Sequence, residues 1–157
     1  MTASPTAGPR LVMEFIIPEK DFLLAGEAAS KTKKALQQLG LREDVVKNAA
    51  IIVYEAAMNV VIHGHSGKLK IVIIPEEVSI ISEDKGAGIP DIELAMQEGY
   101  STAPLEVREM GFGAGMGLPN IKMCSDHLTI KSEPGVGTLL EATISLRASP
   151  TLVEKRE

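Results

Sequence analysis

The chain is poor in the residues that form disulfide bonds and aromatic stacks. It has one cysteine, Cys124, no tryptophan, and an aromatic content of only 3%. A single cysteine excludes an intramolecular disulfide and is typical of a reducing compartment, so we expect a cytoplasmic protein. The shortage of aromatic rings disfavours a site that recognises bases or sugars by stacking.

The sequence also lacks a long uninterrupted apolar run and an excess of positive charge. Its most apolar stretch, residues 45–62, is interrupted by Lys47, Asn48, Glu55 and Asn59, so we expect no membrane span. Lys and Arg total 16 against 21 Asp and Glu, which gives a net charge of −5. This balance disfavours a nucleic-acid partner or an anionic membrane surface.

The length of 157 residues fits one domain, which we place at residues 10–147. Residues 1–9 are small and polar without an apolar signal core, so we expect a disordered tail rather than a targeting peptide. Residues 148–157 are predicted to be a second polar tail.

Apolar periodicity predicts interleaved helices and strands, and therefore a two-layer sandwich in which helices cover one face of a sheet. Gly40 and Gly64 are suited to end the two long helices. The core stripe expected on the first long helix is Leu24, Ala28, Ala35 and Leu39, and on the second Val46, Ala49, Ala50, Val53, Ala57, Val60 and Val61. The predicted helices are residues 22–39, 43–62, 92–97 and 119–124, and the predicted strands are residues 11–17, 68–74, 78–82, 128–131 and 138–146.

Glu55 and Asn59 are separated by one helical turn, so their side chains share one face of the second long helix. An amide oxygen at Asn59, together with phosphate oxygens and waters, would suit Mg²⁺. Glu55 could then orient or deprotonate an attacking hydroxyl or water. The alternative is an ordinary solvated Glu and Asn pair on an amphipathic helix.

Asp84 follows an apolar strand and precedes a turn with two glycines, Gly86 and Gly88. A carboxylate at a strand end can accept the amino group of a base. Glycines allow the backbone to approach a flat heterocycle, on whose face Ile89 could pack. The alternative is an ordinary Asp-x-Gly turn.

Four alternating glycines, Gly111, Gly113, Gly115 and Gly117, precede a helix that begins near Pro119. Glycine at this density costs backbone entropy, and backbone N–H groups at a helix start can bind phosphates. We therefore predict that residues 100–116 form a mobile lid that is ordered by the phosphates of a nucleotide, with a flexible surface loop as the alternative.

His63 lies at i+8 from Glu55, near the end of the same helix, and is expected at the edge of the pocket or in a capping role. Metal ligation by His63 is not expected, because no second matched ligand accompanies it.

These segments together resemble the ATPase superfamily shared by gyrase, heat-shock chaperones, histidine kinases and mismatch-repair proteins. The stretch from Glu55 to Gly64 looks like its N box, that from Asp84 to Ile89 its G1 box, and that from Gly113 to Leu118 its G2 box. Within the superfamily the chain is most similar to small bacterial anti-sigma and stress-switch serine kinases.

The resemblance implies the Bergerat α/β (α+β) sandwich, with a mixed, mostly antiparallel sheet, and ATP or ADP with Mg²⁺ as cofactors. It implies that Glu55 is the catalytic base, Asn59 the Mg²⁺ ligand and Asp84 the adenine anchor. The other nucleotide-binding positions are then His63, Gly86, Gly88, Ile89, Gly113, Gly115, Met116, Gly117, Leu118 and Thr138.

The resemblance leaves two functions open. One is a kinase that phosphorylates a serine or threonine of a STAS-domain anti-anti-sigma or switch protein. The other is an anti-sigma factor or nucleotide-gated binding module that sequesters a partner such as a sigma factor. Either form could be a homodimer. Glu55 favours the kinase, since capture alone needs no base.

Overall fold

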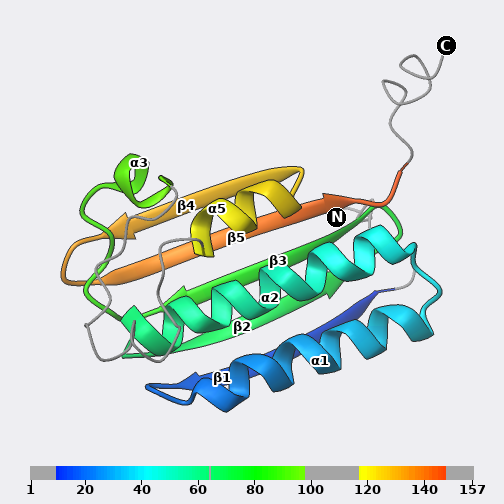
Figure 1. The fold of residues 1–157 in the computed structure, drawn as a ribbon, viewed down its shortest axis with the longest axis horizontal. Coiled ribbons are helices and arrows are strands. Elements are labelled where there is room, and N and C mark those ends of the chain that lie inside the picture. Colours follow the sequence, from blue (N-terminus) through cyan, green and yellow to red (C-terminus); the bar gives the residue numbers. More distant parts are fainter. Residues whose placement is uncertain (1–9, 64, 98–116, 148–157) are drawn as a thin grey trace, which may run out of the picture.

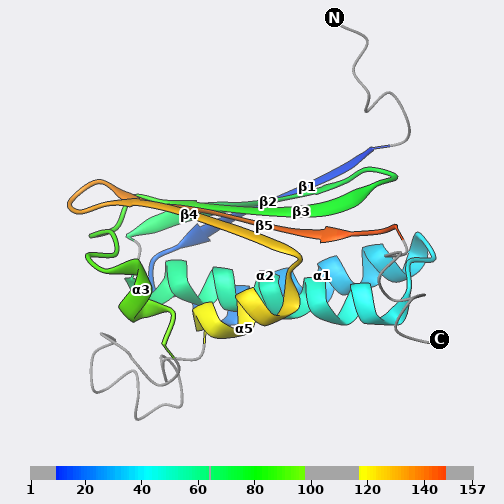
Figure 2. The ribbon, with the colours of Figure 1, turned by 90° about the horizontal axis from the view of Figure 1, so that it is seen from above.

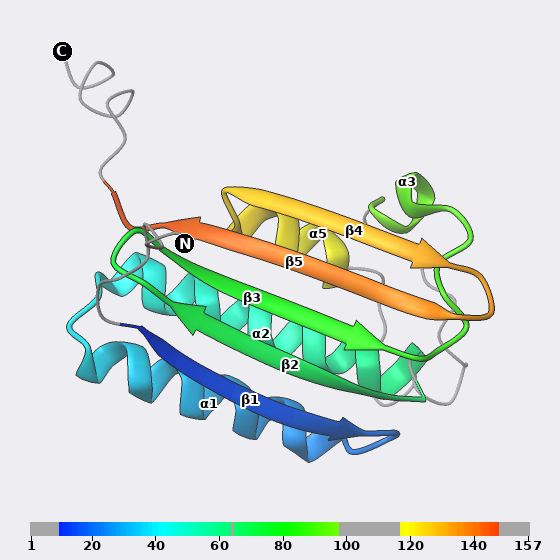
Figure 3. The ribbon, with the colours of Figure 1, turned by 180° about the vertical axis from the view of Figure 1, so that it is seen from behind.

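The computed structural model describes residues 10–63, 65–97 and 117–147. Five strands form one sheet, and the helices lie on one of its faces (Figures 1 and 2). Seen from behind, the strands lie in front of the helices, and no described element covers that face (Figure 3). The elements in chain order are β1 (Leu11–Pro18), α1 (Phe22–Gln38), α2 (Glu43–His63), β2 (Ser66–Ile73), β3 (Glu77–Asp84), α3 (Ile92–Ala95), α5 (Gly117–Cys124), β4 (His127–Glu133) and β5 (Gly137–Ser145).

The sheet has the strand order β1-β2-β3-β5-β4, and each neighbouring pair is antiparallel. The predicted two-layer sandwich with a mostly antiparallel sheet is therefore confirmed, and the described strands include no parallel pair. Because β3 is central, its last residue, Asp84, lies in the interior of one sheet end, beside the first residues of β5.

The core is built around α2, which packs against α1, α5 and the sheet. The predicted stripe is confirmed except at Ala50, which is only half-buried. Ile52, Ala56 and Met58 are buried as well, since neighbours on both flanks widen the covered face of the helix. By length and composition α2 is the one described helix that could cross a membrane, and here it serves as the central core helix.

The predicted core stripe of α1 was partly wrong. The buried residues are Ala25, Ala28, Thr32 and Leu36, whereas Leu39 is 50% exposed. Asp21 caps the helix by accepting the Leu24 N–H at 3.2 Å. Ala28 is buried as predicted, but Leu24 and Ala35 are only half-buried, and Ala25 and Leu36, one position along, are buried in their place. Thr32 was overlooked because a hydroxyl is a poor sign of burial.

The predicted helix end at Gly40 is confirmed, because this glycine has a φ of 76°. Gly64 lies outside the described residues.

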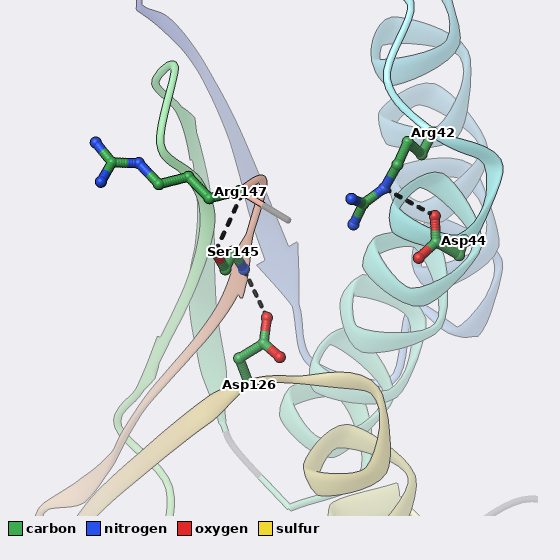
Figure 4. A network of polar contacts seen from close by, with 5 residues as sticks. All are labelled: Arg42, Asp44, Asp126, Ser145 and Arg147. Atoms are coloured by element: carbon green, nitrogen blue, oxygen red, sulfur yellow. Dashed lines mark hydrogen bonds and ion pairs between the residues drawn. The ribbon is translucent and has the colours of Figure 1, made fainter. Parts of the chain in front are cut away.

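Polar contacts close the end of the sheet opposite Asp84 (Figure 4). The Asp126 carboxylate accepts the Ser145 N–H at 2.6 Å, and the Ser145 hydroxyl accepts the Arg147 N–H at 3.3 Å. At the start of α2, Arg42 donates to Asp44 at 3.2 Å. These exposed contacts define the turns and lie away from the functional residues predicted above.

Candidate functional site

Glu55 and Asn59 both face the beginning of α5. A Cβ added at Gly117 would lie 3.2 Å from Asn59 Oδ1 and 3.6 Å from Glu55 Oε1. Both side chains are half-buried, so they are not the fully solvated pair of the alternative interpretation. A side chain at position 117 would enter the space beside these two oxygens, which accounts for glycine there.

Asn120, which had no predicted role, contacts Glu55 directly. Its Nδ2 atom donates to Glu55 Oε2 at 2.9 Å from one turn inside α5. The sequence offered one usable signal, because Asn120 is three residues after Gly117 and so lies on the same helical face.

Asp84 ends β3 and begins a tight turn. Its Oδ1 atom accepts the Gly86 N–H at 2.8 Å, while the next backbone N–H, at Lys85, donates to the Ser66 carbonyl at 3.2 Å. No hydrogen bond reaches Oδ2 from the described part of the chain. Asp84 therefore keeps one carboxylate oxygen that can accept a hydrogen bond from a ligand.

Thr138 lies directly opposite Asp84 in the β3–β5 register and on the same face of the sheet. Its hydroxyl is 3.0 Å from the Ser132 hydroxyl, which also accepts the Ile89 N–H at 2.6 Å. Ser132 was missed by sequence reasoning. Its alternation with Leu128 and Ile130 along β4 could have placed it on the helix-covered side.

The turn after Asp84 is attached to the β4–β5 hairpin. Gly88 has a φ of 83°, and a Cβ there would lie 2.6 Å from the Glu133 carbonyl oxygen. The Gly135 N–H donates to the Ala87 carbonyl at 2.8 Å. Gly88 is thus required by protein packing, whether or not a heterocycle also approaches it. Gly86 is buried within the same turn.

His63 lies at the end of α2, where part of its surface remains open to solvent and part is covered by protein. Protein atoms crowded around the ring lower its pKa by desolvation, and the nearby charge of Asp84 opposes this effect by raising the pKa. A role for His63 at the edge of the site stays a prediction.

Some of the remaining predicted positions are described by the structure, and others lie outside it. Leu118 is buried in the core, so only its backbone could face a ligand. Ile89 is half-buried and packs against the core. Gly113, Gly115 and Met116 lie outside the described residues, as does the whole of the predicted lid, residues 100–116.

A hollow of about 620 Å³ lies at the hairpin end of the sheet. Asp84, Ser132 and Thr138 belong to its lining, but no residue of α2 or α5 does. Several lining residues, such as Glu83 and Leu139, instead belong to the uncovered face. The hollow therefore does not connect Asp84 with Glu55.

The donor set can be tested for Mg²⁺. The described residues contain no group of three or more His, Cys, Asp or Glu that could hold a metal ion. Asn59 Oδ1 and Glu55 Oε1 are hard oxygen donors that face the same helix start. Mg²⁺ commonly takes one or two protein oxygens and completes its shell with phosphates and water, so Asn59 Oδ1 fits it as a protein ligand.

Residues 45–148 match the family described as histidine kinase-, DNA gyrase B-, and HSP90-like ATPase. The chain belongs to this family, and membership implies ATP binding.

The chain is similar to a bacterial serine/threonine-protein kinase and to bacterial anti-sigma factors. The serine/threonine-protein kinase RsbT of Bacillus subtilis (strain 168) is 29% identical over 136 residues, which are 84% of this chain and 94% of that protein. The anti-sigma F factor of Thermoanaerobacter sp. (strain X514) is 38% identical over 96 residues, 58% of this chain and 64% of that protein. That of Bacillus licheniformis is 32% identical over 123 residues, 74% of this chain and 81% of that protein.

Proposed function

We propose that the protein is an ATP-dependent serine/threonine kinase that phosphorylates a STAS-domain partner in a partner-switching pathway of the bacterial cytoplasm. The observation that carries the proposal is the position of Glu55. Its carboxylate lies beside Asn59 and Gly117, at a helix start suited to phosphates.

Each end of the site has a distinct part in this proposal. Asp84 Oδ2 accepts a hydrogen bond from the adenine amino group, and Thr138 on the adjacent strand helps to hold the base. The start of α5 receives the phosphates, and Asn59 contributes an oxygen to Mg²⁺, which neutralises phosphate charge.

Glu55 then serves the transfer step. Its carboxylate orients the substrate hydroxyl and accepts its proton as the hydroxyl oxygen bonds to the γ-phosphorus. The bond between that phosphorus and the bridging oxygen of ADP breaks, so ADP leaves and the partner carries a phosphoester.

The test is transfer of phosphate from ATP to a purified STAS-domain protein. Glu55→Gln keeps the size of the side chain and removes the base, so we expect transfer to fall by about 10²–10⁴-fold with nucleotide affinity retained. Glu43→Gln, at the exposed start of the same helix, is the matched control and should transfer normally.

A second function is supported by the anti-sigma names among the relatives. In this alternative the chain captures a sigma factor or another partner and uses nucleotide as a gate. No transfer by the wild type despite ATP binding would favour capture over the kinase, whereas unchanged transfer in Glu55→Gln would show only that Glu55 is not the base.

A further inference from the structure

We propose that Asn120 is a positioning residue that orients the Glu55 carboxylate and makes its orientation depend on the placement of α5. This inference rests on the proposed function, because it takes Glu55 as the base. Its starting point is the hydrogen bond of 2.9 Å from Asn120 Nδ2 to Glu55 Oε2, which joins two half-buried side chains.

This hydrogen bond gives the two oxygens of the Glu55 carboxylate different roles. Oε2 accepts from Asn120, while Oε1 is the oxygen that faces Gly117 and the neighbouring Asn59 amide. An amide donor cannot take a proton from Glu55, so Asn120 does not compete for the basic role. It restricts rotation of the carboxylate and leaves Oε1 for the substrate hydroxyl.

The position of Asn120 couples this orientation to the phosphate end of the site. Asn120 and Gly117 lie on one face of α5, one turn apart, and both face Glu55. A shift of α5 away from α2 would break the hydrogen bond and release the carboxylate. Glu55 is therefore held in its reactive orientation only while the start of α5 is seated against α2.

The first experiment separates binding from turnover. In Asn120→Ala we expect kcat for phosphate transfer to fall about ten-fold, with the Kd for ATP changed by less than about two-fold. Met123→Ala is the matched control, because it lies on the same helix with a 76% exposed side chain. Normal kcat in a folded Asn120→Ala protein would overturn the inference.

The second experiment uses a variant of the same shape. Asn120→Asp loses the donor and places a second carboxylate beside Glu55 Oε2, so the two side chains repel each other and the orientation of Glu55 is lost. We expect kcat to fall at least as far as in Asn120→Ala, with the Kd for ATP changed by less than about two-fold. A purely structural role, for which the shape of the side chain is enough, would leave kcat unchanged, and a normal kcat in Asn120→Asp would refute the positioning role even if Asn120→Ala failed to fold.

Glu55→Gln distinguishes failure of this inference from failure of the proposed function. If Glu55→Gln abolishes transfer while both Asn120 variants behave as wild type, only the positioning role fails. If Glu55→Gln transfers normally, Glu55 is not the base and this inference fails while the kinase function stands. If the wild type binds ATP and transfers no phosphate, the proposed function fails.

Discussion

Asp84 and Thr138 face each other across β3 and β5 at the end of the sheet, on the side that the helices cover. The Thr138 hydroxyl is held by Ser132 at 3.0 Å, and Asp84 is held by the Gly86 N–H at 2.8 Å. Two side chains from separate motifs thus form one preorganised polar pair. In the proposed function this pair binds the adenine, and its geometry is set by contacts within the protein.

Asp84→Asn should weaken ADP binding about ten- to a hundred-fold, or about 1.5–3 kcal/mol. The amide oxygen can still accept the Gly86 N–H, so the turn should survive while the ionised acceptor for the base is lost. Isothermal titration with ADP measures the effect. Glu83→Gln, an exposed neighbour, is the control. Wild-type affinity in a folded Asp84→Asn protein would refute the adenine assignment.

Asn59→Ala should remove most of the gain in ADP affinity that Mg²⁺ provides, because one hard oxygen donor is lost. Binding without Mg²⁺ should change little. The measurement is the Kd for ADP with Mg²⁺ and with a chelator, and Asn48→Ala on the same helix is the control. An unchanged difference between the two conditions would mean that Asn59 does not contact the ion.

Gly88→Ala should destabilise the fold by about 1–3 kcal/mol, since alanine is strained at a positive φ. The added Cβ would also lie 2.6 Å from the Glu133 carbonyl oxygen. Urea unfolding provides the measurement. Gly26→Ala is the control, because it lies in α1 with no atom within 4 Å of the added Cβ and should be stabilising by about 0.5–1 kcal/mol. A loss at Gly26 with none at Gly88 would contradict this account.

Thr32→Val should raise the free energy of unfolding by as much as about 1–2 kcal/mol. The Thr32 hydroxyl is fully buried and has no hydrogen-bond partner among the described residues. Valine replaces it with a methyl group of similar shape and removes the cost of a desolvated polar group. Thr129→Val on the exposed side of β4 should have little effect. Destabilisation in Thr32→Val would show that the hydroxyl has a partner.

His63 should make stability depend on pH in one direction. Its pKa in the folded protein is lowered from 6.5, chiefly by desolvation, so the unfolded chain binds the proton more readily. Above the unfolded-state pKa of 6.5, His63 is neutral in both states and its full contribution to the free energy of unfolding is present. As the pH falls below 6.5, the unfolded chain takes up the proton first, and this contribution is lost. The free energy of unfolding should therefore fall less between about pH 7.5 and about pH 5.5 in His63→Asn than in wild type.

His127→Asn, at an exposed position on the edge strand β4, is the control for this comparison. Equal losses of stability in His63→Asn and wild type would show that the His63 pKa is not lowered by folding.

The amino-acid sequence by itself determined the local structure and the motifs. Apolar spacing placed α2 and the strands to within a few residues, and Gly40 marked a helix end, because these signals depend on neighbours along the chain. The order of the motifs indicated the family before any contact was known. The clearest error was the core stripe of α1, because the buried face of this helix is determined by its packing against α2.

Only the tertiary structure decided which side chains meet. Asn120 reaches Glu55, and Ser132 joins Ile89 to Thr138, across distances in sequence over which periodicity carries no information. The reason for glycine at position 88 is likewise a contact with a distant hairpin. Such pairings depend on strand register and on how helices seat against the sheet, and these are set by the packing of the whole core.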